Sequence, residues 1–361
     1  RDNYHLLGTD INWLALGDCG SVYPAQQDLF LWRMLAKGNR ERVSEEDVRR
    51  TIERARPYFA PYGEERVKSM EAHVRHNLNA HLGAKMIFYY NRASFQLAPE
   101  FETFKDEWSL TDYRSVPKGN GIWEIKIVPT RSYIDHAVWW YARSFEIGGN
   151  RGVYWDNWFF APSYNTRTHG AYRRGDGTIV PSTGLWGLRE LAKRTFQMMN
   201  ERGMLPITMA HMTSTGILPL LSFCTVQYDW EWKYSEGDVQ DRYSRPYLLL
   251  VSNGEHAGTW PVLLNDHGPQ AEDPWVARTF AGVAMVHELD CPYPEWSPTG
   301  KMQRSLFAPI DALLRRPGLR VHRYWDESPG PVRSSDPDVP VIVYYLPGVE
   351  AVVGVTSYAR E

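Results

Sequence analysis

The chain has 361 residues, 43% of them hydrophobic, which is enough for one large domain of barrel size and a remainder. Its formal net charge of −3 lacks the basic excess of nucleic-acid-binding proteins, and no apolar run reaches the ~18 residues that cross a bilayer. The three cysteines, Cys19, Cys224 and Cys291, lie far apart and form no metal or redox motif. We therefore expect no nucleic-acid partner, no membrane association, no metal and no cofactor.

Short apolar strands alternate with amphipathic helices along most of the chain. The first strand is expected at residues 5–16, and a helix is expected after Ser44, an N-cap residue followed by acidic residues. A further helix should end near Gly83, and the second strand should cover residues 84–90. Residues 91–120 form a long polar and aromatic segment, which we interpret as an ordered flap.

The clearest helix is expected at residues 131–146, between a third strand at 122–128 and a fourth at 152–157. A second long loop covers residues 158–183, and a helix follows at 185–201. The remaining expected elements are strands at 205–210, 223–229, 259–264 and 287–291, a helical stretch around 247–250, and helices at 275–286 and 302–314.

This alternation favours a parallel sheet with helical crossovers. The number of βα units approaches eight, so the sequence predicts an α/β fold, a (β/α)₈ TIM barrel with long βα loops, over residues 1–316. Residues 317–361 differ, because they are β-rich and lack helical periodicity. We expect them to begin an appended β-domain or to add strands that pack on the barrel. Since the chain begins at Arg1, we interpret it as a processed chain or a fragment, from which any signal peptide would already be removed.

Catalytic groups of such a barrel lie at the C-terminal ends of its strands and in the loops that follow. Asp156 ends an apolar strand, and capping of the next loop or an ion pair with Arg151 is its structural alternative. Asp229 and Glu231 stand two residues apart and should share one side of an extended segment. The flanking Trp230 and Trp232 would desolvate Glu231 and raise its pKa, as a general acid requires.

Other residues at expected strand ends have side chains that suit a sugar, although an ordinary core or loop contact is the alternative for each. Flat aromatic rings pack on sugar rings, and a high aromatic content (14%) fits either that use or a large core. The candidate aromatic platforms are Trp13, Tyr90, Trp155, Trp158, Trp230 and Trp232. The candidate polar contacts are Asp10, Asn91, Lys126, Asn157 and His211.

The run Gly152-Val153-Tyr154-Trp155-Asp156-Asn157 is similar to the strand-four motif of retaining glycosidase barrels, among them the α-galactosidase-like and endo-α-N-acetylgalactosaminidase-like families. The segments at 185–189, 209–213, 217–223 and 229–231 resemble bacterial proteins described as glycoside hydrolase family 123-like. The resemblance is best over residues 135–264. It implies a carbohydrate substrate, Asp156 as nucleophile and Glu231 or Asp229 as acid/base. The adjacent Asp-Glu pair of family 123 β-N-acetylgalactosaminidases is missing from the expected strand ends.

We therefore expect a glycoside hydrolase of the retaining type, with Asp156 as nucleophile and Glu231 as acid/base. Retention requires the two carboxyl groups to lie about 5–5.5 Å apart. One alternative is a substrate-assisted N-acetylhexosaminidase, in which Asp229 orients the acetamido group and Glu231 is the acid. The other is a carbohydrate-binding barrel without catalysis.

Overall fold

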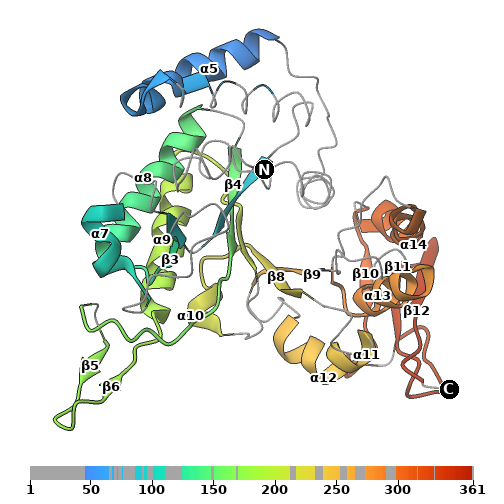
Figure 1. Cartoon of the computed structure of the whole chain (residues 1–361). Coiled ribbons are helices and arrows are strands. Elements are labelled where there is room, and N and C mark those ends of the chain that lie inside the picture. The colour runs from blue at the N-terminus through green and yellow to red at the C-terminus, as the bar shows by residue number, and fades with distance from the viewer. Residues whose placement is uncertain are drawn as a thin grey trace. The chain divides into compact units, whose positions relative to one another are not determined.

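The computed structural model is drawn in Figure 1. It describes residues 45–64, 67–68, 71, 75, 86–91, 93–95, 101–110, 124–147, 150–167, 170–211, 217–231, 239–252, 258–264, 273–289, 298–314, 316–328 and 330–359. These residues form two compact units, and each is described by itself. The first unit contains the described residues up to Val226, and the second contains those from Gln227 onward.

The fold is mixed α/β and contains a parallel sheet. Strand β1 (Met86–Asn91) pairs in parallel with β4 (Asn150–Asp156), which pairs in parallel with β7 (Thr208–His211). The hydrogen-bonded order continues with β8 (Val226–Glu231) and β9 (Trp260–Leu264). This order is also the order along the chain.

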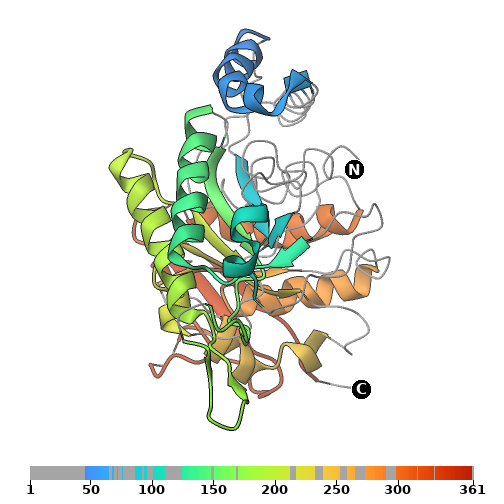
Figure 2. The same ribbon diagram turned by 60° about the vertical axis from the view of Figure 1, so that its left-hand side comes forward.

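Two long helices pack against each other in the first unit, α8 (Arg131–Ile147) before β4 and α9 (Leu185–Glu201) between β4 and β7. Figures 1 and 2 both show them side by side. Each buries a stripe of apolar residues at helical spacing, such as Ile134 and Tyr141 in α8 and Leu188 in α9. The expected helix at 185–201 matches α9. The short α10 (Leu218–Leu221) lies between β7 and β8.

The predicted third strand does not join the parallel sheet among the described residues. The strand found there, β3 (Glu124–Lys126), pairs antiparallel with β2 (Ala93–Phe95), and β1 is the direct neighbour of β4. Ser109, directly after α7 (Phe101–Trp108), forms an antiparallel bridge with Ile127, the residue that follows β3. The segment therefore has antiparallel partners, which a pattern of alternating residues could not distinguish from parallel ones.

The described residues of the first unit also form a helix and a small hairpin. Helix α5 (Glu45–Phe59) begins one residue after the expected N-cap and continues into the 3₁₀ turn η1 (Ala60–Tyr62). Helix α5 packs against α8. A small hairpin, β5 (Tyr172–Arg173) with β6 (Ile179–Val180), projects from the long loop after β4.

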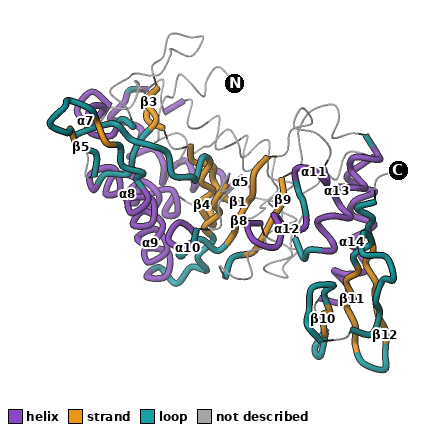
Figure 3. Tube along the Cα trace, turned by 90° about the horizontal axis from the view of Figure 1, so that it is seen from below, coloured by secondary structure: helices purple, strands orange, loops and turns teal. Residues whose placement is uncertain are grey.

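The second unit contains an antiparallel sheet covered by helices. The sheet has the order β10 (Arg320–His322), β11 (Val341–Leu346), β12 (Glu350–Val355). Helices α13 (Pro274–Val286) and α14 (Pro298–Leu314) pack against it, as Figure 3 also shows. Its smaller helices are α11 (Val239–Arg242), α12 (Arg245–Tyr247) and the π-helix η3 (Leu248–Ser252).

The described part of the expected strand at 287–291 is the end of helix α13. His287 is the C-cap residue, and the backbone N–H of Leu289 donates to the carbonyl of Ala284 at 2.9 Å. Glu288 has φ 55°, the left-handed conformation that closes helices. That position usually carries glycine, so the sequence did not indicate a helix end there. Among the described residues, no helix is long and apolar enough to span a bilayer.

Candidate functional site

Three parallel strands of the first unit end side by side at residues proposed from the sequence. The Cα atom of Asn91, the last residue of β1, pairs with that of Asp156, the last residue of β4. On the other side of β4, Trp155 pairs with Ala210, and His211 follows as the last residue of β7. The backbone therefore brings Asn91, Asp156 and His211 into one row at the carboxyl edge of the sheet, where βα proteins place their ligands.

His211 is held inside the first unit. Its side chain is 3% exposed, and its Nδ1 hydrogen-bonds with the hydroxyl of Tyr154 from β4. The carbonyl of His211 accepts from the backbone N–H of Trp158 at 2.9 Å, so the chain leaving β4 is fixed to the end of β7. The expected contact between His211 and a sugar hydroxyl is therefore corrected to a contact between two strands.

The chain turns directly after Asp156. Asn157 has φ 58°, in the left-handed region that few residues other than glycine enter. Asparagine enters it more readily because its short polar side chain can hydrogen-bond locally. Such backbone conformations concentrate at functional sites. Here the turn stands between the candidate carboxylate and its loop.

Trp155 and Trp158 belong to the core. Both are 2% exposed, and their rings stack with centroids 4.4 Å apart at an interplanar angle of 18°. The indole N–H of Trp155 donates to the hydroxyl of Tyr141, and that of Trp158 donates to the carbonyl of Leu220. This packing corrects the expectation that the two rings are open sugar platforms. The sequence could not separate the two uses, because a tryptophan beside a carboxylate suits either.

Exposed aromatic side chains occur farther along the same connection. Phe160, Tyr164 and Tyr172 are exposed in the loop after β4, and Trp186 in the first turn of α9 is 68% exposed. These residues were not among the platforms predicted from the sequence, because the aromatic residues nearest the carboxylates were expected to face the ligand. The available signal was their position in a long loop that follows a candidate catalytic strand.

A cavity of about 860 Å³ lies beside Trp186, where α8 and α9 begin. Its lining is largely apolar, with Val128, Ile134 and Leu185 among the wall residues, and Ser182 and Thr183 contribute hydroxyl groups. Its volume is in the range of ligand pockets, about 300–1,000 Å³. The cavity is lined by residues that precede and begin α8 and by residues of the connection between β4 and β7.

Glycine residues permit the close approach of segments at this cavity. A Cβ atom on Gly187 would lie 2.2 Å from the carbonyl oxygen of Pro129, so only glycine lets α9 begin against this segment. Gly184, which precedes α9, has φ 67° and leaves the helix without a side-chain cap. The shape of the cavity therefore depends on Gly184 and Gly187 as well as on the sheet.

For the remaining candidates the structure gives a backbone position or none. Asp229, Trp230 and Glu231 are the last three residues of β8, and Tyr90 lies in β1, so only their backbone positions are described. Lys126 lies in β3, so it ends a strand of the antiparallel pair. Asp10, Trp13 and Trp232 fall outside the described residues.

Metal-binding side chains do not cluster in the described ranges, where no group of three or more His, Cys, Asp or Glu residues is placed to hold an ion. Comparison with models of known protein families gives no match, and comparison with curated proteins gives none either. The candidate site is therefore defined by its residues and by the geometry of the sheet edge.

Proposed function

We propose that the chain is a glycoside hydrolase with Asp156 as nucleophile and Glu231 as acid/base, built on a (β/α)₈ barrel. The observation that supports this most is the register of β1 and β4, which pairs Asn91 with Asp156 at the carboxyl edge of a parallel sheet whose strands follow the chain order. A barrel places its catalytic groups at that edge.

The proposed chemistry has two steps. The Asp156 carboxylate attacks the anomeric carbon and forms a glycosyl ester, while Glu231 gives its proton to the oxygen of the leaving group. Glu231 then takes a proton from water, whose oxygen attacks the anomeric carbon and releases Asp156. In this mechanism Asn91, whose backbone is next to Asp156, binds a sugar hydroxyl.

The loop after β4 would bind the rest of the saccharide. Its exposed aromatic rings, together with Trp186 at the edge of the 860 Å³ cavity, offer apolar faces to sugar rings. The hydroxyls of Ser182 and Thr183 in the same cavity can exchange hydrogen bonds with sugar hydroxyls. We assign the platform role to these residues, in place of Trp155 and Trp158.

The test is hydrolysis of a panel of aryl glycosides by the full chain. Asp156→Asn should lower kcat on the order of 10³-fold or more, because the amide keeps the shape but cannot act as a nucleophile. Glu46→Gln is the control: Glu46 is an exposed residue of α5 whose ion pair with Arg50 is 3.0 Å long, and its loss should leave kcat unchanged. Glu231→Gln should spare substrates with good leaving groups, which need little protonation.

Two results would contradict this assignment. If Asp156→Asn keeps near-normal activity while Asp229→Asn abolishes it, hydrolysis is substrate-assisted. If oligosaccharides bind to the chain but no glycoside of the panel is cleaved, the chain binds carbohydrate without catalysis.

A further inference from the structure

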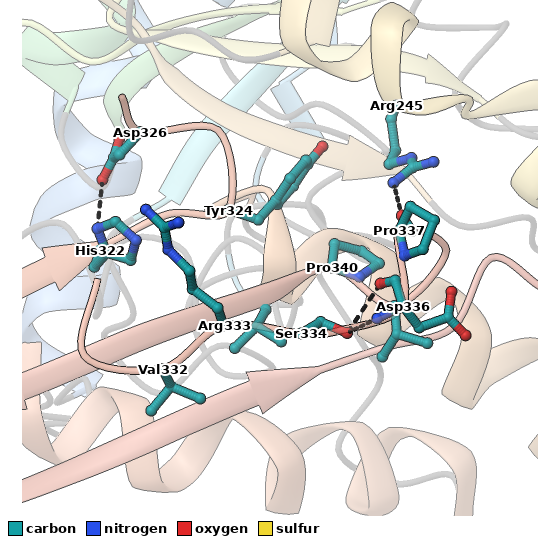
Figure 4. A pocket seen from close by; sticks show the side chains of 12 residues that line it. Arg245, His322, Tyr324, Asp326, Val332, Arg333, Ser334, Asp336, Pro337 and Pro340 are labelled. Atoms are coloured by element: carbon teal, nitrogen blue, oxygen red, sulfur yellow. Dashed lines mark hydrogen bonds and ion pairs between the residues drawn. The ribbon is translucent and has the colours of Figure 1, made fainter. Parts of the chain in front are cut away.

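A second cavity, of about 360 Å³, lies wholly within the second unit. Three segments form it: the start of α12, the turn that follows β10, and the loop that precedes β11. Figure 4 shows the side chains of these segments converging on the cavity. Its volume suits a ligand the size of a single sugar ring, at the lower end of the usual range of about 300–1,000 Å³.

Two guanidinium groups line the cavity, and they differ in their partners. Arg245 donates to the carbonyl of Pro337 and lies 3.4 Å from a carboxylate oxygen of Asp338, so its charge is already paired. Arg333 has no hydrogen bond or ion pair with any described residue, and Figure 4 shows its guanidinium between His322 and Tyr324. A planar guanidinium binds carboxylates and other oxyanions with two parallel hydrogen bonds, so Arg333 is suited to an anionic group.

The two carboxylates of the lining are partly engaged by the protein. One oxygen of Asp326 accepts from the backbone N–H of Arg323 at 2.9 Å and lies 3.4 Å from Nδ1 of His322. Asp336 accepts from the backbone N–H of Asp338 at 2.8 Å. Each carboxylate keeps lone pairs that can accept hydrogen bonds from a ligand. A fully deprotonated anion such as sulfate would meet these negative charges without a hydrogen-bond donor of its own.

Tyr324 adds a hydrogen-bond acceptor to the cavity. Its hydroxyl lies 2.8 Å from Nε2 of His287, whose Nδ1 lies 2.8 Å from the carbonyl of Val283. The carbonyl can only accept, so Nδ1 carries the proton and Nε2 accepts the proton of Tyr324. Burial lowers the pKa of His287 to about 4, which keeps the imidazole neutral in this role. The Tyr324 oxygen therefore offers lone pairs to a ligand rather than a proton.

The walls of the cavity are held by short-range contacts, so little ordering is needed on binding. Ser334 donates to the carbonyl of Asp336 at 2.9 Å, and the backbone N–H of Val339 donates to the same carbonyl at 3.1 Å. Gly330 lies against the imidazole of His322, where an added Cβ would fall 1.7 Å from a ring carbon. Preorganisation of this kind lowers the entropic cost of binding.

From these groups we infer that the cavity binds a small polyhydroxylated acid, such as a hexuronate, with its carboxylate on Arg333 and its hydroxyls on Asp326 and Tyr324. The acid supplies an anion for Arg333, which has none among the described residues, and its hydroxyls donate to Asp326 and Tyr324. None of these residues belongs to the hydrolytic site proposed above, so binding of the acid can be tested independently of hydrolysis.

Calorimetric titration of the full chain with glucuronate tests the site, and it needs no turnover. Glucuronate should bind, and Arg333→Gln should weaken binding by roughly tenfold or more, as expected for the loss of hydrogen bonds to a charged group. Arg320→Gln, which removes an exposed arginine of β10 outside the lining, should bind like the wild type. Glucose, phosphate and sulfate are titrated at the same ionic strength.

The ligands and variants separate the parts of this inference. Glucose binding as tightly as glucuronate would remove the role of Arg333. Phosphate or sulfate binding as tightly as glucuronate would show that the hydroxyls are not recognised. Equal weakening by Arg333→Gln and Arg320→Gln would show a general charge effect. Each of these results overturns the assignment, and so does a failure of glucuronate to bind to the wild type.

Discussion

His287 should make the second unit sensitive to acid. The side chain has 0% exposure, stacks on Trp325, and is hydrogen-bonded to Val283 and Tyr324. Burial is the main cause of its lowered pKa, the nearby charge of Arg245 lowers it further, and the hydrogen bond to Val283 raises it. Protonation of this imidazole therefore competes directly with folding of the unit.

The size of the effect follows from the two pKa values. In the unfolded chain the pKa is about 6.5, whereas in the folded chain it is about 4, so the unfolded state binds more protons between these values. The stabilising contribution is therefore fully present above pH 6.5 and is lost as the pH falls toward 4. Between pH 7 and pH 4.5 the loss amounts to about 2 kcal/mol in the free energy of unfolding.

Hydrogen exchange on peptides from α13 and β11 measures this loss, because it reports opening of the second unit itself. The comparison is between the wild type and His287→Gln, in which the side chain remains polar but does not titrate. Titration of all other groups cancels in the difference between the two proteins. From pH 7 to pH 4.5 the wild type should lose about 2 kcal/mol more than the variant.

Tyr324→Phe serves as the matched control. It removes the hydroxyl that bonds to His287 but keeps the buried imidazole, so the dependence on pH should remain. Parallel curves for the wild type and His287→Gln would refute the reasoning, because they would mean that His287 is not held neutral by burial in the folded chain.

Two further substitutions test the first unit. Gly152→Ala should lower the free energy of unfolding by about 1–3 kcal/mol in urea titrations. The reason is that a Cβ would lie 2.6 Å from the carbonyl oxygen of Ile207, the residue that precedes β7. An unchanged urea midpoint would contradict the close approach of these segments. Trp186→Ala should raise KM for oligosaccharides several-fold with little change in kcat, whereas Trp139→Ala, which removes an exposed tryptophan of α8, should change neither. Equal effects of the two tryptophan variants on KM would exclude Trp186 as a platform.

Helices were the part of the fold that the sequence predicted best. The predicted range 185–201 matches α9. The predicted range 131–146 ends one residue before α8 ends, and the range 275–286 begins one residue after α13 begins. A helix buries residues at a fixed local spacing, so its pattern is contained in the segment itself. The partner of a strand is not contained in the segment, which is why the strand at 122–128 was assigned to the wrong sheet.

The candidate site divides in the same way. The positions of Asn91, Asp156 and His211 at strand ends followed from the apolar runs that precede them. The burial of Trp158 did not, because it depends on the left-handed turn at Asn157. The helix end at Glu288 was missed for a related reason, since a non-glycine residue occupies a position that glycine usually marks.

The stacked pair formed by Trp155 and Trp158 has a spectroscopic consequence. Two indoles whose centroids lie 4.4 Å apart couple their electronic transitions, and in a chiral setting such coupling produces a pair of circular dichroism bands of opposite sign. These two residues flank Asp156 and the turn at Asn157. Trp139 and Trp140 in α8 form a second close pair, with centroids 4.6 Å apart. The difference between the circular dichroism spectra of the wild type and of Trp158→Phe therefore reports on the end of β4 without a ligand or a label.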